Sequence, residues 1–261
     1  MDVIPGASLL LALAAVALAG LVHGTLGIGF PMVATPLIAL GTDVRTAILL
    51  TLAPTLAVNI LSILRGGRWR ESLGRHWPVA VFVLIGSVAG TRLLIGVDPA
   101  PFKLLLAAMI GVYLATSAHP RQEWWGWIGR CRRLAAAGFG LAAGLLAGVV
   151  NVAVPVLIIY FSELQLAPLA LVQILNLCFM AGKIAQAGTF ALTGHLSAAI
   201  LLWSLPLAAM AVAALWAGMA LRQRVDAGTY RRWLRRGLLV IAGLLVLQFA
   251  AALASSPTAA G

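Results

Sequence analysis

The sequence predicts an all-α polytopic membrane protein with two inverted-topology repeats, each a broken, re-entrant-like helix pair followed by three transmembrane helices. Three observations predict this class: an apolar composition, basic residues gathered in short loops, and two apolar segments interrupted by glycine and proline. Of 261 residues, 62% are hydrophobic and 10% are charged, whereas a soluble domain carries about a quarter charged residues. So few charged side chains cannot cover a water-facing surface.

Apolar stretches occupy nearly the whole chain, and six or more of them approach the ~20 residues that span a bilayer as a helix. They cover roughly residues 6–22, 31–40, 43–64, 76–95, 99–118, 133–149, 152–163, 166–190, 196–221 and 234–253. The first stretch is a poor signal peptide, because Asp2 stands where positive charge is expected, so we expect it to remain in the mature chain. We expect one integral membrane domain over residues 1–261, with repeat 1 at about 6–118, repeat 2 at about 133–253 and a cytoplasmic linker at 119–132.

The basic residues predict the topology. The formal charge is +11, and of the 18 Lys and Arg residues four lie in loop 65–75, four in loop 119–133 and six in loop 222–236. Because basic loops stay in the cytoplasm, these three loops should share the cytoplasmic face, and the turns near Asp43, Asp98 and His195 should face outward. A nucleic-acid partner is not expected, because no aromatic-basic platform accompanies the charge. The lipid bilayer is a sufficient partner for these arginines.

The two halves of the chain resemble each other. An offset of 124 residues lays Pro31 on Pro155, and an offset of 128 lays Trp77-Pro78 on Leu205-Pro206 and Val97-Asp98 on Val225-Asp226. Each half has five segments, an odd number, so the second half enters the membrane upside down. Inverted repeats with discontinuous helices are the architecture of secondary transporters. The alternative is a chance resemblance, because apolar runs align easily.

The first broken segment carries Gly24, Gly27 and Gly29 before Pro31, and the second carries Gly144 and Gly148 before Asn151 and Pro155. Glycine allows a tight non-helical turn, and proline is suited to the first turn of a new helix. Irregular backbone at membrane depth must be surrounded by protein or line a water-filled cavity. We therefore expect both half-helix N-termini to face one midplane cavity, where their partial positive charge favours an anion. The alternative is that the glycines allow close helix packing and the prolines only kink the helices.

These motifs resemble the TauE/SafE family of sulfite and organosulfonate exporters. The resemblance rests on Gly24-x-x-Gly27-x-Gly29 with Pro31 and Pro36, on Asn151-x-x-x-Pro155, and on Ile158-Ile159-Tyr160. It implies a multi-pass permease of the bacterial inner membrane for small sulfur-containing anions, with both breaks near the substrate path. The chain departs from the usual family pattern at Phe30 and at Asn151-Val152-Ala153-Val154, where the family usually has further glycines or a Gly-Gly-Pro run. These departures leave the substrate open.

Two polar stripes are predicted to form facing walls of the cavity. Lys183 lies well inside the stretch 166–190, and a charge at this depth usually faces a cavity or a partner. It shares a helix face with Gln173, Asn176 and, less well aligned, Gln186. The equivalent helix of the first half carries Thr51, Thr55, Asn59 and Ser62. The alternative is that Lys183 snorkels to the outer surface from its helix.

We expect a permease that moves sulfite or organosulfonates by alternating access at a midplane site between the repeats. The candidate substrate-binding residues are Gly27, Gly29, Phe30, Pro31, Thr51, Thr55, Asn59, Asn151, Pro155, Gln173, Asn176 and Lys183. His23 stands at the first break and is a candidate for proton coupling; the alternative is a histidine bonded to freed backbone carbonyls. Arg45 and Arg92 are candidate cations on the anion path, or alternatively interface anchors.

No cofactor or metal site is expected, because Cys131 and Cys178 have no recognisable ligand spacing. A membrane-embedded enzyme acting on a lipid-linked or small anionic substrate is the rival class. It would need a nucleophile with a base, paired carboxylates or a metal cluster, and the sequence shows no such arrangement. A structural membrane subunit is a third class, but it would not require two equivalent breaks. The sequence leaves the direction of transport, the coupling ion and the oligomeric state open.

Overall fold

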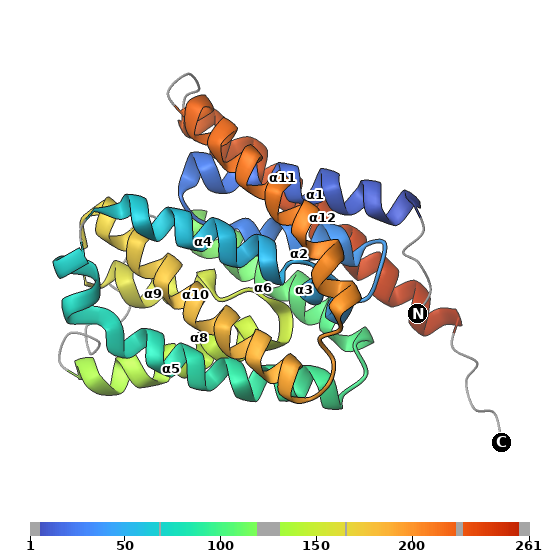
Figure 1. The fold of residues 1–261 in the computed structure, drawn as a ribbon, viewed down its shortest axis with the longest axis horizontal. Coiled ribbons are helices and arrows are strands. Elements are labelled where there is room, and N and C mark those ends of the chain that lie inside the picture. The colour runs from blue at the N-terminus through green and yellow to red at the C-terminus, as the bar shows by residue number, and fades with distance from the viewer. Residues whose placement is uncertain (1–5, 68, 119–130, 165, 223–226, 256–261) are drawn as a thin grey trace.

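The computed structural model describes residues 6–67, 69–118, 131–164, 166–222 and 227–255. Over these residues the protein is all-helical, which confirms the all-α part of the predicted fold class (Figure 1). The helices are α1 (Gly6–Leu26), α2 (Phe30–Ala39), α3 (Val44–Leu50), α4 (Leu52–Gly66), α5 (Trp69–Gly96), α6 (Ala100–Ala118), α8 (Arg132–Val150), α9 (Val154–Ser162), α10 (Pro168–Leu192), α11 (Ala198–Arg222) and α12 (Ala227–Ser255). Every predicted apolar stretch contains a helix or a pair of helices.

Six of the described helices are long and apolar enough to cross a membrane: α1, α5, α8, α10, α11 and α12. α3 and α4 together form a bent pair that counts as a seventh candidate span. α2 has 10 residues and α9 has 9, so at about 1.5 Å per residue each reaches only about half way across a ~30 Å hydrocarbon core. The protein is therefore a multi-pass membrane protein that also contains half-length helices.

The stretch 43–64 was expected to be a transmembrane helix, and the structure shows it as a bent pair of helices. α3 and α4 meet at Thr51 with a bend of 49°. Pro54 explains the bend, because proline has no N–H for the carbonyl of Leu50 and its ring clashes with that carbonyl. The Thr51 hydroxyl donates to the carbonyl oxygens of Ala47 at 2.9 Å and Ile48 at 3.0 Å, in the buried last turn of α3.

Both predicted breaks are present. α1 ends at Leu26, and Gly27 and Gly29 then adopt φ values of 81° and 101° before α2 begins. α8 ends at Val150, and Asn151 has a φ of 62° before α9 begins at Val154. A proline lies in the first turn of each new helix. The chain reverses at both points, so α1 with α2 and α8 with α9 form two interrupted helix hairpins.

Three glycines that we assigned to the breaks lie instead within helices, where they allow close packing. A Cβ atom at Gly24 of α1 would lie 2.2 Å from the carbonyl oxygen of Leu215 in α11. A Cβ atom at Gly148 of α8 would lie 2.6 Å from the carbonyl oxygen of Ser87 in α5, and Gly144 packs on α5 in the same way. The alternative interpretation, close helix packing, therefore holds for Gly24, Gly144 and Gly148, whereas Gly27 and Gly29 make the turn.

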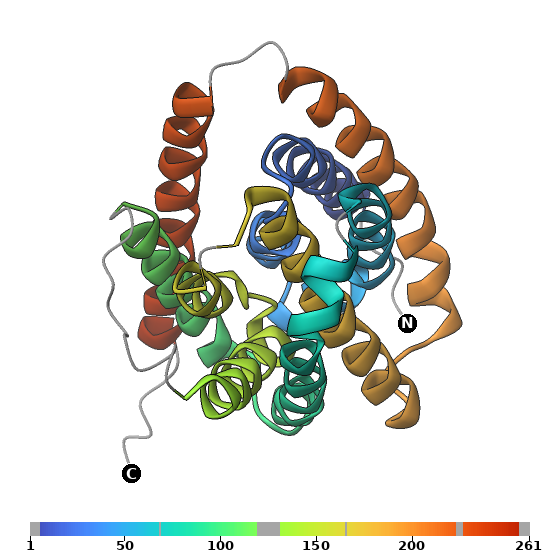
Figure 2. The ribbon, with the colours of Figure 1, turned by 90° about the vertical axis from the view of Figure 1, so that its left-hand side faces the viewer.

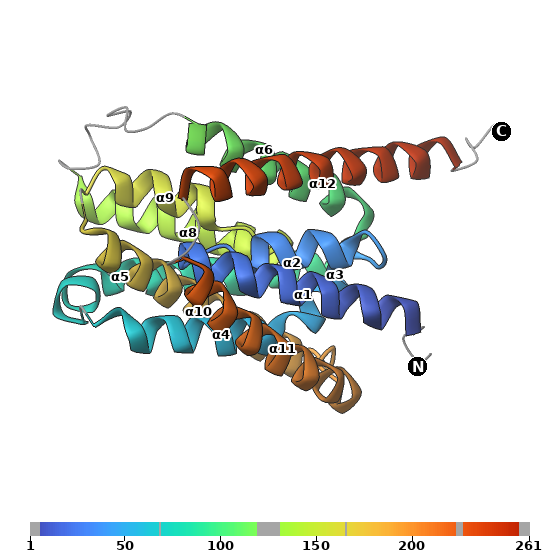
Figure 3. The same cartoon turned by 90° about the horizontal axis from the view of Figure 1, so that it is seen from above.

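The helices pack largely in pairs, and α10 joins two parts of the molecule. α1 packs along α11, α8 packs along α5, and α10 lies against both α4 and α5. Figure 2 shows α12 beside α6 at one edge of the molecule and α11 outside α1 at another. The ends of α4 and α11 and the starts of α5, α8 and α12 lie toward the left of Figures 1 and 3, whereas the turns after α2, α5 and α10 lie toward the right. The helix ends that flank the basic loops thus share one end of the molecule, although residues 119–130 and 223–226 of those loops lie outside the described residues.

Candidate functional site

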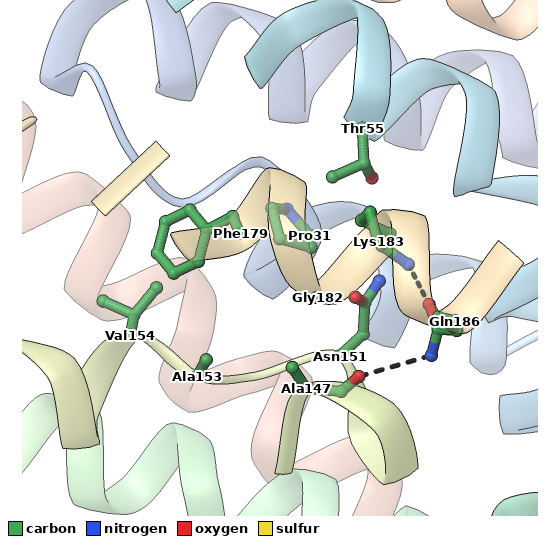
Figure 4. A pocket seen from close by; sticks show the side chains of 10 residues that line it. All are labelled: Pro31, Thr55, Ala147, Asn151, Ala153, Val154, Phe179, Gly182, Lys183 and Gln186. Atoms are coloured by element: carbon green, nitrogen blue, oxygen red, sulfur yellow. Dashed lines mark hydrogen bonds between the residues drawn. The ribbon is translucent and has the colours of Figure 1, made fainter. Parts of the chain in front are cut away.

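Both breaks meet α4 and α10 in a small pocket, here called the central pocket. It combines the start of α2, the α8–α9 break and one face of α10, with Thr55 of α4 opposite (Figure 4). Its volume is about 10 Å³, which is room for about one water molecule. The lining residues are Pro31, Thr55, Ala147, Asn151, Ala153, Val154, Phe179, Gly182, Lys183 and Gln186. Four of the predicted substrate-binding residues therefore lie together: Pro31, Thr55, Asn151 and Lys183.

Lys183 is held inside the protein and does not snorkel. Its side chain is 3% exposed, and its Nζ atom donates to Oε1 of Gln186 at 2.5 Å. The amide nitrogen of Gln186 in turn donates to the carbonyl oxygens of Gly148 at 3.0 Å and Ala147 at 3.3 Å, at the end of α8. Among the described residues no carboxylate contacts Lys183. The central pocket therefore contains a lysine side chain without a carboxylate partner among the described residues.

Asn151 connects the second break to the first half of the chain. Its amide nitrogen donates to Oγ1 of Thr35 at 2.7 Å and to Oγ1 of Thr51 at 3.4 Å. Asparagine tolerates the left-handed φ of 62° better than most non-glycine residues. One residue thus terminates α8 and ties the break to α2 and to the bend between α3 and α4.

Several buried polar atoms near α4 and α10 have no hydrogen-bond partner among the described residues. They are Oγ1 of Thr55, both amide atoms of Asn59 and Oδ1 of Asn176. Buried polar groups are nearly always paired, so each such atom indicates a water molecule, a ligand or a second conformation. Thr55 lines the central pocket itself, and Asn59 lies one helical turn further along α4. The polar stripe of α4 therefore has unused hydrogen-bonding capacity.

Gln173 and Asn176 hold α10 against its neighbours rather than lining the central pocket. The amide nitrogen of Asn176 donates to the carbonyl oxygen of Gly27 at 2.8 Å, within the first break. The amide nitrogen of Gln173 donates to the carbonyl oxygen of Ile63 at 3.1 Å, near the end of α4. These contacts fix the first break and α4 relative to the helix that carries Lys183.

His23 lies on the other side of the first break, fully buried in the last turn of α1. Its Nδ1 atom accepts the backbone N–H of Phe30 at 3.3 Å, and its Nε2 atom lies 2.9 Å from Oγ of Ser62. In the neutral imidazole, Nε2 therefore carries the proton and donates it to Ser62. The histidine accepts from a freed amide at the start of α2, so the alternative of bonding to freed carbonyls is wrong.

The remaining predicted residues lie outside the central pocket. The Phe30 ring is fully buried in the hydrophobic core, and Pro155 lies in the first turn of α9. Arg45 donates to the carbonyl oxygens of Leu94 at 2.8 Å, Ile95 at 3.1 Å and Val97 at 3.2 Å, at the end of α5. Arg92 is exposed on α5. Both cations thus lie at the end of the molecule opposite to the basic loops.

Three residues of this site are absent from the predicted substrate-binding residues. Gln186 is the direct partner of Lys183, and its spacing of three residues on one helix was a usable signal. Thr35 accepts from Asn151 across 116 residues of sequence, so no local pattern identifies it. Gly182 lines the central pocket beside Lys183, and its carbonyl oxygen accepts from Oγ of Ser87 at 2.8 Å.

The chain was also compared with known proteins. A family model described as sulfite exporter TauE/SafE matches residues 12–249. Neither a curated protein nor a solved structure matches the chain. The match includes both breaks and every residue that lines the central pocket. The family is one of membrane transporters for sulfite and related anions, and because its model matches almost the whole sequence, the chain belongs to the sulfite exporter TauE/SafE family.

Proposed function

We propose that this protein is a permease of the bacterial inner membrane that moves sulfite or a small organosulfonate through the central pocket by alternating access. One observation carries the proposal: the buried ammonium of Lys183, without a counter-ion, lies where two half-helices begin. Helix N-termini and an ammonium group both favour negative charge. In the bilayer, a lone cation is costly unless a partner arrives.

The hydrogen bonds suggest how an anion would be held. In the present conformation the Lys183 ammonium donates its hydrogen bond to Gln186, and the pocket has room for about one water molecule. An entering oxyanion would replace Gln186 at the ammonium and accept from the Thr55 hydroxyl, which has no partner among the described residues. The pocket must widen for this, which requires relative movement of α4, α10 and the two breaks.

Equivalent contacts in the two halves support the inverted repeats. Gly24 meets Leu215 and Gly148 meets Ser87, and these two pairs are related by the same offsets of 124 and 128 residues that align the prolines. Gly27 and Asn151 are related by the offset of 124 and both have positive φ. Repeats of this kind allow alternating access, because each half can adopt the arrangement of the other. We assign the repeats to about 6–118 and 133–253.

Flux measurements in proteoliposomes test the proposal. The wild-type protein should move sulfite without changing it chemically, and Lys183→Met should abolish the flux. Lys103→Met is the matched control, because Lys103 lies on α6 and also donates to a glutamine, Gln248, at 3.1 Å, but lies outside the central pocket. Equal loss in both variants would contradict the assignment of the site. Chemical turnover of sulfite or of a lipid-linked substrate would instead indicate the rival class, a membrane-embedded enzyme.

A further inference from the structure

A second cavity lies on the far side of the first break from the central pocket. This cavity, here called the vestibule, has a volume of about 620 Å³ and lies between α1, α4, α10 and α11. Its polar lining consists of His23, Ser62, Arg65 and Arg222, and Gly27 and Val172 line its inner part. It lies where α4 and α11 end, which is the end of the molecule that carries the basic loops (Figures 1 and 3). Unlike the central pocket, it is large enough for a small oxyanion with its water molecules.

The two arginines give the vestibule positive charge that no described carboxylate compensates. Arg65 stacks on the ring of Trp216, with its guanidinium carbon 3.8 Å from the ring centroid. A cation–π contact holds the guanidinium in place without neutralising it. Arg222 is the last residue of α11, and no ion pair joins either arginine to a described residue. A planar guanidinium presents paired N–H donors that match an oxyanion.

The bond between His23 and Ser62 adds a hydroxyl donor to the same cavity. Because the neutral His23 donates to Ser62, the Ser62 hydroxyl proton has no acceptor among the described residues. Ser62 lies three residues before Arg65, so both side chains lie on neighbouring parts of one helix face. The vestibule therefore offers guanidinium and hydroxyl donors, and its inner part reaches the first break, beyond which the central pocket begins.

The opposite end of the molecule is closed at the corresponding place. On the proposed repeat alignment, Leu169 and Arg222 of the vestibule correspond to Arg45 and Leu94. Arg45 donates to the carbonyl oxygens of Leu94, Ile95 and Val97, which fastens α3 onto the end of α5. Leu169 and Arg222 instead line an open cavity. At these corresponding positions, the basic end thus has an open cavity, whereas at the other end hydrogen bonds of Arg45 join α3 to α5.

We propose that Arg65 and Arg222, with the Ser62 hydroxyl, form a second anion-binding site that captures a small sulfur oxyanion before it passes to the central pocket. This inference rests on the proposed function and places the capture site on the cytoplasmic side. Capture at the mouth raises the local concentration of the anion beside the narrow path, an effect that salt weakens.

Binding stoichiometry tests the site without requiring transport. Sulfite is titrated calorimetrically into the purified full-length protein in nanodiscs of phosphatidylcholine. Two sites are expected for the wild type, one for Lys183→Met, and one for Arg65→Gln with Arg222→Gln. Arg222→Gln alone serves as a second variant, because Arg222 forms no contact comparable to the Arg65–Trp216 stack. If Lys183→Met binds no sulfite while wild-type flux is intact, the capture site is overturned and the proposed function stands. If two sites are found but no anion is transported, the proposed function fails and the capture site stands.

Sided transport kinetics supply the second test. With sulfite on the cytoplasmic side, Arg65→Gln and Arg222→Gln should each raise KM about tenfold, the loss expected for one charge-assisted hydrogen bond. The kcat values should remain within about twofold. Arg235→Gln, which removes an exposed arginine of α12 outside the vestibule, should leave KM unchanged, and an equal KM in all three variants would overturn the proposal. The titration is repeated in nanodiscs that contain phosphatidylglycerol, to identify the source of the anion. Loss of the second sulfite site in these nanodiscs would show that the site binds a lipid headgroup, and this result would overturn the capture of sulfite.

Discussion

Lys183 and Gln186, one turn apart on α10, form a 2.5 Å hydrogen bond that closes the central pocket. Gln186 also donates to the last carbonyl groups of α8, so it links the only ammonium among the pocket-lining residues to the second break. This arrangement keeps the lysine solvated by protein groups in the absence of an anion. It also makes Gln186 the group that an entering anion must displace.

Gln186→Glu should weaken anion binding in the central pocket while the protein still folds. A carboxylate at this position would pair with Lys183 and supply the missing counter-ion, so an entering sulfite would compete with a fixed negative charge. We expect sulfite affinity, measured by calorimetry, to fall at least about a hundredfold, since the loss includes both pairing and repulsion. Gln186→Met is the comparison, because it removes the bond to Lys183 and the donation to α8 without adding a negative charge. Wild-type affinity in Gln186→Glu would show that the anion does not bind Lys183.

Substitutions of Asn151 should separate the backbone role of this residue from its side-chain role. Asn151→Gly keeps the left-handed φ of 62° without strain but loses the bonds to Thr35 and Thr51, whereas Asn151→Ala loses the bonds and strains the backbone. We expect the unfolding free energy of the alanine variant to lie about 1–2 kcal/mol below that of the glycine variant. Both variants should lose transport equally, as measured in proteoliposomes, because the loss comes from the missing amide. Normal transport by Asn151→Gly would limit the role of Asn151 to the backbone.

The sequence could predict the helices and the breaks because the bilayer restricts both. Lipid requires apolar residues along each span, so the candidate spans within α1, α5, α8, α10, α11 and α12 follow the apolar stretches, although α5 and α12 begin earlier, at Trp69 and Ala227. Pro31 and Pro155 likewise mark the starts of α2 and α9. The bend at Thr51 was missed because Pro54 acts on the carbonyl four residues earlier, inside a stretch whose length suits a single membrane-spanning helix.

The partners of the site could not be predicted, because they depend on which helices become neighbours. Gly24 and Gly148 have the same local sequence signal whether they form a turn or pack on another helix, and only the positions of α11 and α5 decide between these roles. The bond between Asn151 and Thr35 spans 116 residues. The polar face of α10, in contrast, followed from helical periodicity alone. This periodicity pointed to Lys183, which is buried in the structure and is predicted to bind the substrate.

Gly148→Ala should destabilise the protein, whereas Gly138→Ala on the same helix should not. A Cβ atom at position 148 would lie 2.6 Å from the Ser87 carbonyl oxygen and force α8 away from α5, but no atom lies within 4 Å of a Cβ atom at position 138. We expect Gly138→Ala to gain roughly 0.5–1 kcal/mol, the usual effect of removing glycine from a helix interior. Gly148→Ala should lose about 1–3 kcal/mol, as overpacked sites do. Thermal unfolding in detergent measures both, and equal melting temperatures would contradict the close approach of α5 and α8.

His23→Gln should separate proton coupling from the structural role of the histidine. Glutamine can accept from the Phe30 amide and donate to Ser62 as the neutral imidazole does, but it cannot take up a proton. His23 lines the vestibule together with Arg65 and Arg222. Protonation would occupy Nδ1, release the Phe30 amide and loosen the start of α2, which links proton uptake to movement of the first break.

We therefore expect His23→Gln to retain exchange of sulfite for sulfite and to lose accumulation driven by a pH gradient. His195→Gln, in the turn between α10 and α11, is the control and should retain both activities. Proton-driven accumulation by His23→Gln at the wild-type level would exclude this residue as the coupling group.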